Sequence, residues 1–190
     1  MSIVKKFFLF EKHVCPWWLA YSWDNRLRRI IHHPDKILKP YLKNSNRAAD
    51  IGCGMGYFTT AMVEYVGQSG KVYAVDVQQK MLDILKRRSQ NLSRRLSIET
   101  ILTDGQNFDI NESLDFILMF WMLHEVENKE SFLAKWYALL NLGGKYLLVE
   151  PKIHTTQKAF DEEVKICLQV GFKEILQPKV WGSRAILFKK

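Results

Sequence analysis

Three glycines at alternate positions form the most distinctive chemistry-bearing stretch of this sequence. Gly52, Gly54 and Gly56, with Cys53 among them, follow the carboxylate of Asp50 and separate an apolar strand-like run from an apolar helix-like run. Glycine tolerates positive φ and has no Cβ, so the backbone can turn tightly and come close to a bound molecule. The helix that follows presents free N–H groups at its start. The stretch therefore predicts a ligand-binding turn.

The spacing of these glycines argues against nucleotide cofactors with phosphates. The dinucleotide pattern GxGxxG needs glycine at position 57, where Tyr57 stands, and no Gly-Lys-Ser/Thr follows as in a triphosphate-binding loop. Asp50 would also repel a pyrophosphate. S-adenosylmethionine has no phosphate: Asp50 could balance its ammonium and sulfonium charges, and a helix N-terminus suits its carboxylate. This methyl donor is the predicted cofactor.

A second acidic residue supports a nucleoside site. The β-rich run Val72 to Val75 ends in Asp76, about twenty positions after Gly56, the interval at which an acidic residue reaches ribose hydroxyls in βαβ nucleotide folds. Asp76 is the predicted ribose ligand, and Val77 and Met81 after it are included in the cofactor site.

A third strand, residues 98 to 102, is followed by Asp104 and Gly105. The carboxylate of Asp104 could accept a hydrogen bond from an adenine amino group, while Gly105 permits the chain to turn. The alternative for Asp104 is an Asx turn that ends the strand.

The fourth strand, residues 114 to 120, ends in an aromatic pair and is soon followed by two polar residues. Phe120 is predicted to border the cofactor, and Trp121 and Glu125 to contact the methyl acceptor. His124 is the candidate general base, with a helix-capping or loop histidine as the alternative. Open α/β sheets bind ligands at the carboxyl ends of their strands, so these positions and the three earlier carboxylates would share one crevice.

These motifs together resemble those of class I S-adenosylmethionine-dependent methyltransferases, over residues 47 to 190. The resemblance rests on the stretches Ala49 to Gly56, Tyr73 to Asp76, Thr103 to Gly105, Met122 to Val126 and Leu142 to Lys145. It is strongest to the small-molecule branch, which includes quinone-ring and arsenite methyltransferases. The resemblance implies direct in-line methyl transfer to a small molecule, with S-adenosylhomocysteine as product.

Residues 1 to 46 differ from the rest by their basicity. They contain nine Lys or Arg against three acids, which accounts for most of the chain's net charge of +8. In the resembling family such an extension packs over the cofactor crevice as a lid, which would bring Trp17, Trp18 and Tyr21 to the substrate; a solvated basic face is the alternative. Cys15 could bind a soft metalloid or be a buried thiol.

Hydrophobic spacing predicts the elements that position these residues. Helices are predicted over 34–42 and 57–66, and three apolar stripes at helical spacing indicate further helices (Met81, Leu82, Leu85, Leu92; Phe132, Leu133, Trp136, Leu139, Leu140; Phe160, Val164, Cys167, Leu168). Further strands are predicted over 146–149, 172–176 and 185–188. The alternation predicts an α/β, Rossmann-like, doubly wound sheet of seven strands, mainly parallel, with one antiparallel strand near the C-terminus and an N-terminal helical lid.

Composition fits one globular domain, residues 1 to 190, with 47% hydrophobic and 25% charged residues. No metal site or disulfide framework is predicted from three cysteines without a CxxC pair, and a cytoplasmic location is expected. An RNA methyltransferase that uses the basic N-terminal arm is the main alternative function. A non-catalytic cofactor-binding protein and a peripheral membrane contact through residues 5 to 10 are the others. The sequence carries no signal for an oligomeric state.

Overall fold

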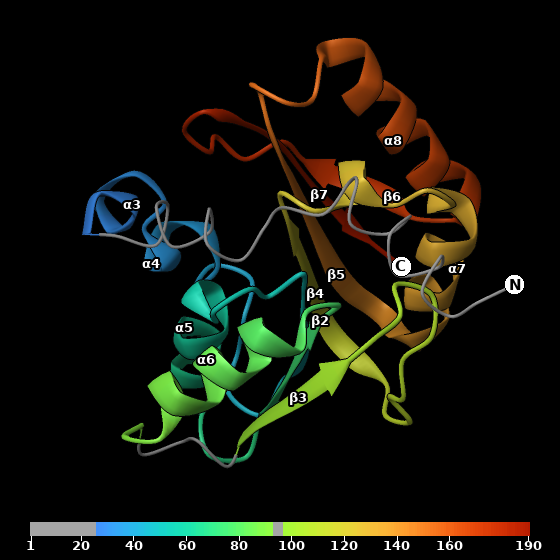
Figure 1. Ribbon diagram of the computed structural model, residues 1–190. Coiled ribbons are helices and arrows are strands. Elements are labelled where there is room, and N and C mark those ends of the chain that lie inside the picture. The colour runs from blue at the N-terminus through green and yellow to red at the C-terminus, as the bar shows by residue number, and fades with distance from the viewer. Residues whose placement is uncertain (1–25, 93–96) are drawn as a thin grey trace, which may run out of the picture.

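The computed structural model describes residues 26–92 and 97–190 (Figure 1). Its helices, in chain order, are α3 (Arg26–Ile31), α4 (Pro34–Ile37), α5 (Tyr57–Val66), α6 (Gln79–Ser89), the 3-10 turn η2 (Leu123–Glu125), α7 (Lys129–Leu139) and α8 (Gln157–Val170). Its strands are β1 (Arg47–Ile51), β2 (Lys71–Asp76), β3 (Ile98–Leu102), β4 (Leu114–Phe120), β5 (Leu140–Pro151), β6 (Lys173–Leu176) and β7 (Ser183–Lys189).

The strands form one sheet in the order β3-β2-β1-β4-β5-β7-β6. The pairs among β1 to β5 are parallel, whereas β7 runs antiparallel to both β5 and β6. From β1 the chain adds strands on one side of the sheet up to β3 and then crosses to the other side at β4, so the strand order switches between β1 and β4. At such a switch point, open α/β sheets have a crevice at the carboxyl ends of their strands. The predicted seven-stranded, mainly parallel sheet with one antiparallel strand is confirmed.

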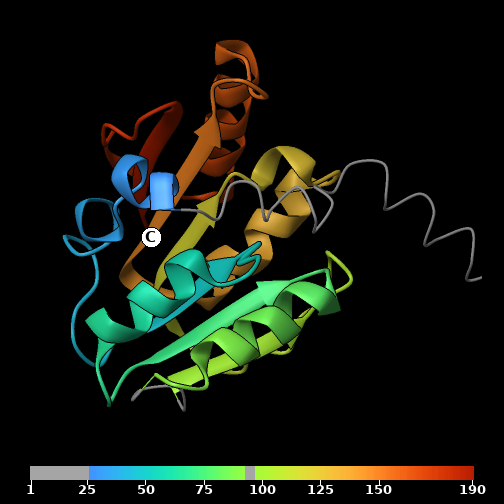
Figure 2. The same ribbon diagram turned by 60° about the vertical axis from the view of Figure 1, so that its left-hand side comes forward.

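Helices cover both faces of the sheet, α5 and α6 on one and α7 and α8 on the other (Figures 1 and 2). Alternate residues of each buried strand serve the two faces, because side chains along a strand point to opposite sides. In β4, Ile117 and Met119 pack in the core beneath α7 and α8, while Phe116 and Leu118 pack in the core beneath α4 and α5. Nearly all of β4 is therefore apolar and buried.

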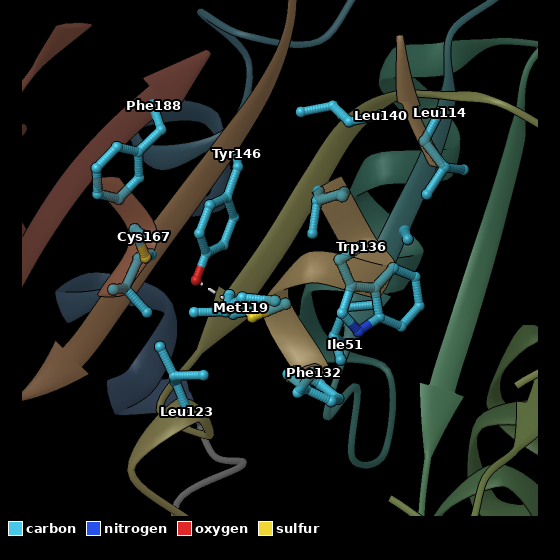
Figure 3. Packing of buried hydrophobic residues seen from close by; sticks show 14 of the residues in the cluster. Ile51, Leu114, Met119, Leu123, Phe132, Trp136, Leu140, Tyr146, Cys167 and Phe188 are labelled. Atoms are coloured by element: carbon cyan, nitrogen blue, oxygen red, sulfur yellow. Dashed lines mark hydrogen bonds between the residues drawn. The ribbon is translucent and has the colours of Figure 1, made fainter. Parts of the chain in front are cut away.

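The core beneath α7 and α8 is rich in aromatic side chains (Figure 3). Trp136 is fully buried and stacks on Phe108 at 4.0 Å between ring centroids. The hydroxyl of buried Tyr146 lies 3.2 Å from Met119 Sδ, to which it donates. The two helices start at side-chain caps: Asn128 accepts from the N–H of Ser131, and the Thr156 hydroxyl accepts from an N–H in the next turn.

Two predictions about helices are wrong. The helix predicted over 34–42 ends at Ile37 and continues as turns, because Pro40 has no N–H and disfavours the helical conformation of the residue before it. Two residues assigned to helical stripes lie outside the helices, because Leu92 follows α6 and Leu140 begins β5. Leu168 lies on α8 as predicted but is 47% exposed instead of packing in the core.

The fifth strand is longer than the predicted 146–149. Its partner β4 pairs Leu114 with Leu140 but Phe116 with Lys145, so the residues between form a bulge on β5. Gly143 lies in this bulge with a φ of 77°, and Leu142 is 91% exposed. The stretch from Leu142 to Lys145 therefore lies within an irregular part of an extended strand. At its other end β5 continues to Glu150 and Pro151, which proves important for the site.

Candidate functional site

The turn after β1 has the conformation that its glycines predict. Gly52, Gly54 and Gly56 have φ values of 69°, 53° and 83°, a region that other residues rarely adopt. A Cβ at Gly52 would lie 2.9 Å from Met122, and one at Gly56 only 2.2 Å from Leu85. A Cβ at Gly54 would have no atom of the described residues within 4 Å. Two glycines therefore permit close packing inside the protein, while Gly54 faces open space where a ligand could approach the backbone.

Asp50, at the end of β1, is buried beneath this turn. Its side chain is 2% exposed, and its Oδ2 accepts a hydrogen bond of 2.5 Å from the Thr59 hydroxyl on α5. Burial raises the pKa of Asp50 to about 6, against the hydrogen bond from Thr59 and the charge of Arg28, which lower it. Because burial disfavours the ionised form of Asp50, a cation bound nearby would stabilise that ionised form.

Asp76, at the end of β2, holds the turn from the other side. Its Oδ2 accepts from the N–H of Gly54 at 2.8 Å, and its Oδ1 from the N–H of Gln78 at 2.9 Å. Burial raises its pKa, against these backbone hydrogen bonds. Asp76 therefore bonds directly to the glycine turn, and the charges of both Asp76 and Asp50 act on Cys53 within it.

The other residues of the predicted cofactor site near β2 differ in exposure. Met81 is buried and packs with Met55, a residue of the glycine turn, whereas Val77 is half-buried. Cys53 is 7% exposed, and burial raises its thiol pKa well above the ordinary value. A thiol in this state is a poor nucleophile, which agrees with a packing role inside the turn.

Asp104 forms an Asx turn. Its Oδ1 accepts from the backbone N–H groups of Gln106 and Asn107, and its Oδ2 from the Asn107 side chain. These hydrogen bonds lower the pKa of Asp104, and Gly105 turns the chain with a φ of 87°. The alternative stated for Asp104 is therefore present in the structure, and its contact with adenine stays a prediction.

The end of β4 packs against the segment that precedes β1. Phe120 and Trp121 both contact the ring of His32 edge-on, with centroids 5.2 and 5.0 Å apart. His32 is 3% exposed, and its Nε2 lies 3.0 Å from the carbonyl oxygen of Trp181. Trp121 has a φ of 61°, and its Nε1 donates to Ser183 Oγ at 2.9 Å. A positive φ strains the backbone of a tryptophan, and such strained residues are often found at functional sites.

His124 is paired with a carboxylate that the sequence analysis missed. Its Nδ1 bonds to Oε2 of Glu150, a fully buried residue near the end of β5. Burial lowers the pKa of His124, but the hydrogen bond and charge of Glu150, with Glu125 and Glu163, outweigh it, so the net shift is upward. Glu150 could have been found by the rule that found Asp50 and Asp76, a carboxylate directly after a buried apolar strand.

The structure thus brings the predicted residues after β1, β2 and β4 to one edge of the sheet. Arg28, His32, Thr59 and Glu150 join them without having been predicted. Arg28 lies over the ring of Tyr57, with its guanidinium carbon 4.5 Å from the centroid. The predicted substrate contacts Trp17, Trp18 and Tyr21, and Cys15, lie outside the described residues.

The chain matches the model of a known family, described as a methyltransferase domain, over residues 48–144. This span holds the glycine turn and the ends of β1 to β4. The protein belongs to this methyltransferase family. The predicted membership of the small-molecule branch is supported by curated relatives: a demethylmenaquinone methyltransferase of Lactobacillus johnsonii is 31% identical over 57% of this chain, and one of Oceanobacillus iheyensis is 27% identical over 61%. This chain spans about half the length of these two relatives, 45% and 49%.

Solved structures of methyltransferases show the same fold. A SAM-dependent methyltransferase from Aquifex aeolicus superposes with a TM-score of 0.79 at 22% identity, over 92% of this chain and 98% of that one. The N-methyltransferase NodS of Bradyrhizobium japonicum, in complex with S-adenosylhomocysteine, gives a TM-score of 0.72 at 16% identity, over 97% and 98%. At these identities the likeness concerns the fold.

Proposed function

We propose that this methyltransferase moves a methyl group from S-adenosylmethionine to a small-molecule acceptor. The observation that carries the proposal is the glycine turn between two buried carboxylates, with open space above Gly54. Asp50 and Asp76 create an anionic environment that repels phosphates and suits a cofactor whose reactive end is cationic. Curated relatives named for demethylmenaquinone and for cobalt-precorrin-6B act on small molecules, which supports this class of acceptor.

The cofactor would lie along the carboxyl ends of β1 to β3. In this arrangement Asp50 and the backbone of Gly52 to Gly56 bind the methionine end, and Asp76 binds the ribose. Val77, Met81, Asp104 and Gly105 surround the adenine. The cofactor supplies an electrophilic methyl group on a sulfonium. Phe120 and Trp121 border that end and exclude water, and Trp121 and Glu125 contact the acceptor. The protein's main task is then to align donor and acceptor for in-line displacement.

Calorimetric titration with S-adenosylhomocysteine tests the cofactor site. We expect micromolar binding to the wild type and at least about a tenfold loss in Asp76→Ala, because a buried carboxylate that bonds a ligand hydroxyl contributes on the order of 1.5–3 kcal/mol. Asp83→Ala on the exposed face of α6 is the matched control and should bind normally. Equal affinity in Asp76→Ala and the wild type would show that the ribose lies elsewhere.

RNA methylation is the second candidate, and the net charge of +8 favours it. Incubation with methyl-labelled cofactor and a cell lysate, followed by fractionation into small molecules, RNA and protein, separates the candidates. We expect the label in the small-molecule fraction. Label in RNA would promote the second candidate, and cofactor binding without any transferred label would favour a non-catalytic protein.

Contact with a membrane surface is a further candidate for residues 5 to 10, which lie outside the described residues. In the described ranges 26–92 and 97–190, no helix has the length and apolar character to cross a bilayer. Flotation with liposomes tests the surface contact. The cytoplasmic location and the single-domain organisation remain predictions.

A further inference from the structure

Glu150 is fully buried and is held in one position by three donors. Its Oε1 accepts from the N–H of Leu123 at 2.8 Å. Its Oε2 accepts from the Thr155 hydroxyl at 3.3 Å and bonds to Nδ1 of His124. Burying a carboxylate is costly unless it is hydrogen-bonded, so this network fixes both the side chain and the loop that carries His124.

The network also determines which nitrogen of His124 can take a proton. An ionised carboxylate only accepts hydrogen bonds, so Nδ1 of His124 carries the hydrogen and the lone pair of the neutral ring is on Nε2. None of the described residues bonds to Nε2, and the side chain is one-quarter exposed. His124 therefore has a basic nitrogen available to a ligand.

His124 also lies beside the proposed cofactor turn. Met122, two residues before it, packs so closely on the turn that a Cβ at Gly52 would lie 2.9 Å from Met122 Cβ. Trp121, the start of the same loop, is the strained residue that borders the proposed acceptor space. The histidine and the glycine turn thus belong to one packed unit.

From this geometry we infer that Glu150 is a positioning residue that makes His124 the proton acceptor, and that the methyl acceptor reacts at an O–H or N–H group. The inference rests on the proposed function. In the step, the bond between the acceptor atom and the methyl carbon forms as the carbon–sulfur bond breaks, and that electron pair passes to sulfur. The O–H or N–H bond breaks, and its proton goes to Nε2 of His124 and then to solvent. An acceptor without such a proton, such as a tertiary amine or a thioether, would not need His124 and Glu150.

Charged groups from several elements face His124. Glu125 lies on its own turn, Glu150 on β5 and Glu163 on α8, and all three favour the imidazolium. The ring of His154 stacks at 6.3 Å between centroids. Lys129 on α7 acts on Glu163, whose pKa burial and Glu150 raise to about 7. The excess of carboxylates stabilises the imidazolium, which makes His124 a stronger base than a free imidazole.

Nuclear magnetic resonance of the whole protein with ¹⁵N-labelled histidine tests the pairing without an acceptor. We expect His124 in the Nδ1–H tautomer with a pKa above 6.5, and a lower pKa in Glu150→Gln. Glu162→Gln, the exposed neighbour of Glu163 on α8, is the matched control and should leave His124 unchanged. An Nε2–H tautomer, or a pKa unaffected by Glu150→Gln, would overturn the pairing.

Label transfer from methyl-labelled S-adenosylmethionine to the small-molecule fraction of a lysate tests the chemistry. We expect the turnover rate to rise with pH as His124 loses its proton, and to fall about 10²-fold in His124→Gln and about tenfold or more in Glu150→Gln. Both variants should bind S-adenosylhomocysteine as the wild type does. If Glu150→Gln does not fold, the turnover rate of His124→Gln and the His124 tautomer in the wild-type spectra still test the inference.

The outcomes separate this inference from the proposed function. Labelled products methylated on a carbon atom, a tertiary amine or a thioether, or full turnover in His124→Gln, would overturn the inference and leave the proposed function intact. A wild type that neither binds S-adenosylhomocysteine nor transfers label would overturn the proposed function and with it the O–H or N–H acceptor.

Discussion

At the residue scale, Asp50 links the stability of the protein to its proposed cofactor. Its pKa in the folded state is about 6, whereas an unfolded aspartate titrates near 3.8. A raised pKa means that the folded state binds the proton more tightly, so the stability from protonated Asp50 is complete below about pH 4 and is lost as the pH rises through 6. At neutral pH the buried charge destabilises the free protein.

We therefore expect Asp50→Asn to stabilise the protein and to weaken the site. At pH 7 the free energy of unfolding should rise by up to about 3 kcal/mol, the equivalent of the shift from 3.8 to about 6, and its decline between pH 4 and 7 should flatten. Affinity for S-adenosylmethionine should fall at least about tenfold. Chemical denaturation across this pH range and calorimetry measure the two effects. Lower stability of the variant at pH 7 would contradict this account of burial.

Gly54 allows the conformational and the ligand-binding roles of a glycine to be separated. Gly54 and Gly143 both have positive φ and open space around the position of a Cβ, but only Gly54 lies at the site. Alanine at either position should cost on the order of 1 kcal/mol of stability, because both force an L-residue into the left-handed region. Only Gly54→Ala should lose affinity for S-adenosylhomocysteine. Equal binding by the two variants would place the cofactor away from Gly54.

The carboxylates at the ends of β1 and β2 were predictable from one rule, that ligands bind where parallel strands end. Glu150 directly follows the predicted fifth strand and fits the same rule, but the predicted site included only the ends of the first four strands. Its partner His124 was found from the motif alone. The pairing itself depends on contact in space between His124 on η2 and Glu150 on β5, and no local sequence pattern records such a contact.

At the scale of elements, α3 and α4 are attached to the strand ends through His32. The buried ring contacts Phe120 and Trp121 and bonds to the backbone of the loop between β6 and β7. The adjacent His33 is about half exposed. Because His32 is buried and His33 is exposed, substitutions at these two neighbours can test whether His32 holds the helices.

We expect His32→Ala to loosen α3 and α4, with a loss of about 2–4 kcal/mol from the buried ring and its hydrogen bond. His33→Ala should cost less than about 0.5 kcal/mol, as for an ordinary surface residue. Limited trypsin digestion measures how firmly α3 and α4 are held, because cleavage after Arg28 should be faster in His32→Ala but not in His33→Ala. Similar digestion of both variants would mean that the aromatic contacts do not hold these helices.

Element boundaries were less predictable than element types. All seven strands and four helices were expected near where they lie, because apolar periodicity reports burial. The β5 bulge was not expected, since it depends on how Leu140 and Lys145 pair with β4. The short α4 could have been found from Pro40, which the apolar spacing of the 34–42 segment obscured.

At the scale of the whole molecule, the net charge of +8 attracts polyanions whether or not RNA is the substrate. We expect a homopolymeric RNA to bind weakly at 50 mM salt and to dissociate by a few hundred millimolar, because released counterions dominate such binding. Saturation with S-adenosylhomocysteine should not change it. Fluorescence anisotropy across a salt series measures this. Tight, sequence-dependent binding at physiological salt would instead favour the RNA methyltransferase.

The position of β7 has a consequence for how the molecule is assembled. This strand follows β6 in the sequence, yet it lies between β5 and β6 rather than at a border of the sheet. A nascent polypeptide that has not yet extended past β6 therefore presents the unpaired backbone of β5, a long apolar strand, to its surroundings. The sheet can close only after β7 has been synthesised, and products that terminate before β7 are expected to be substrates for chaperones and proteases.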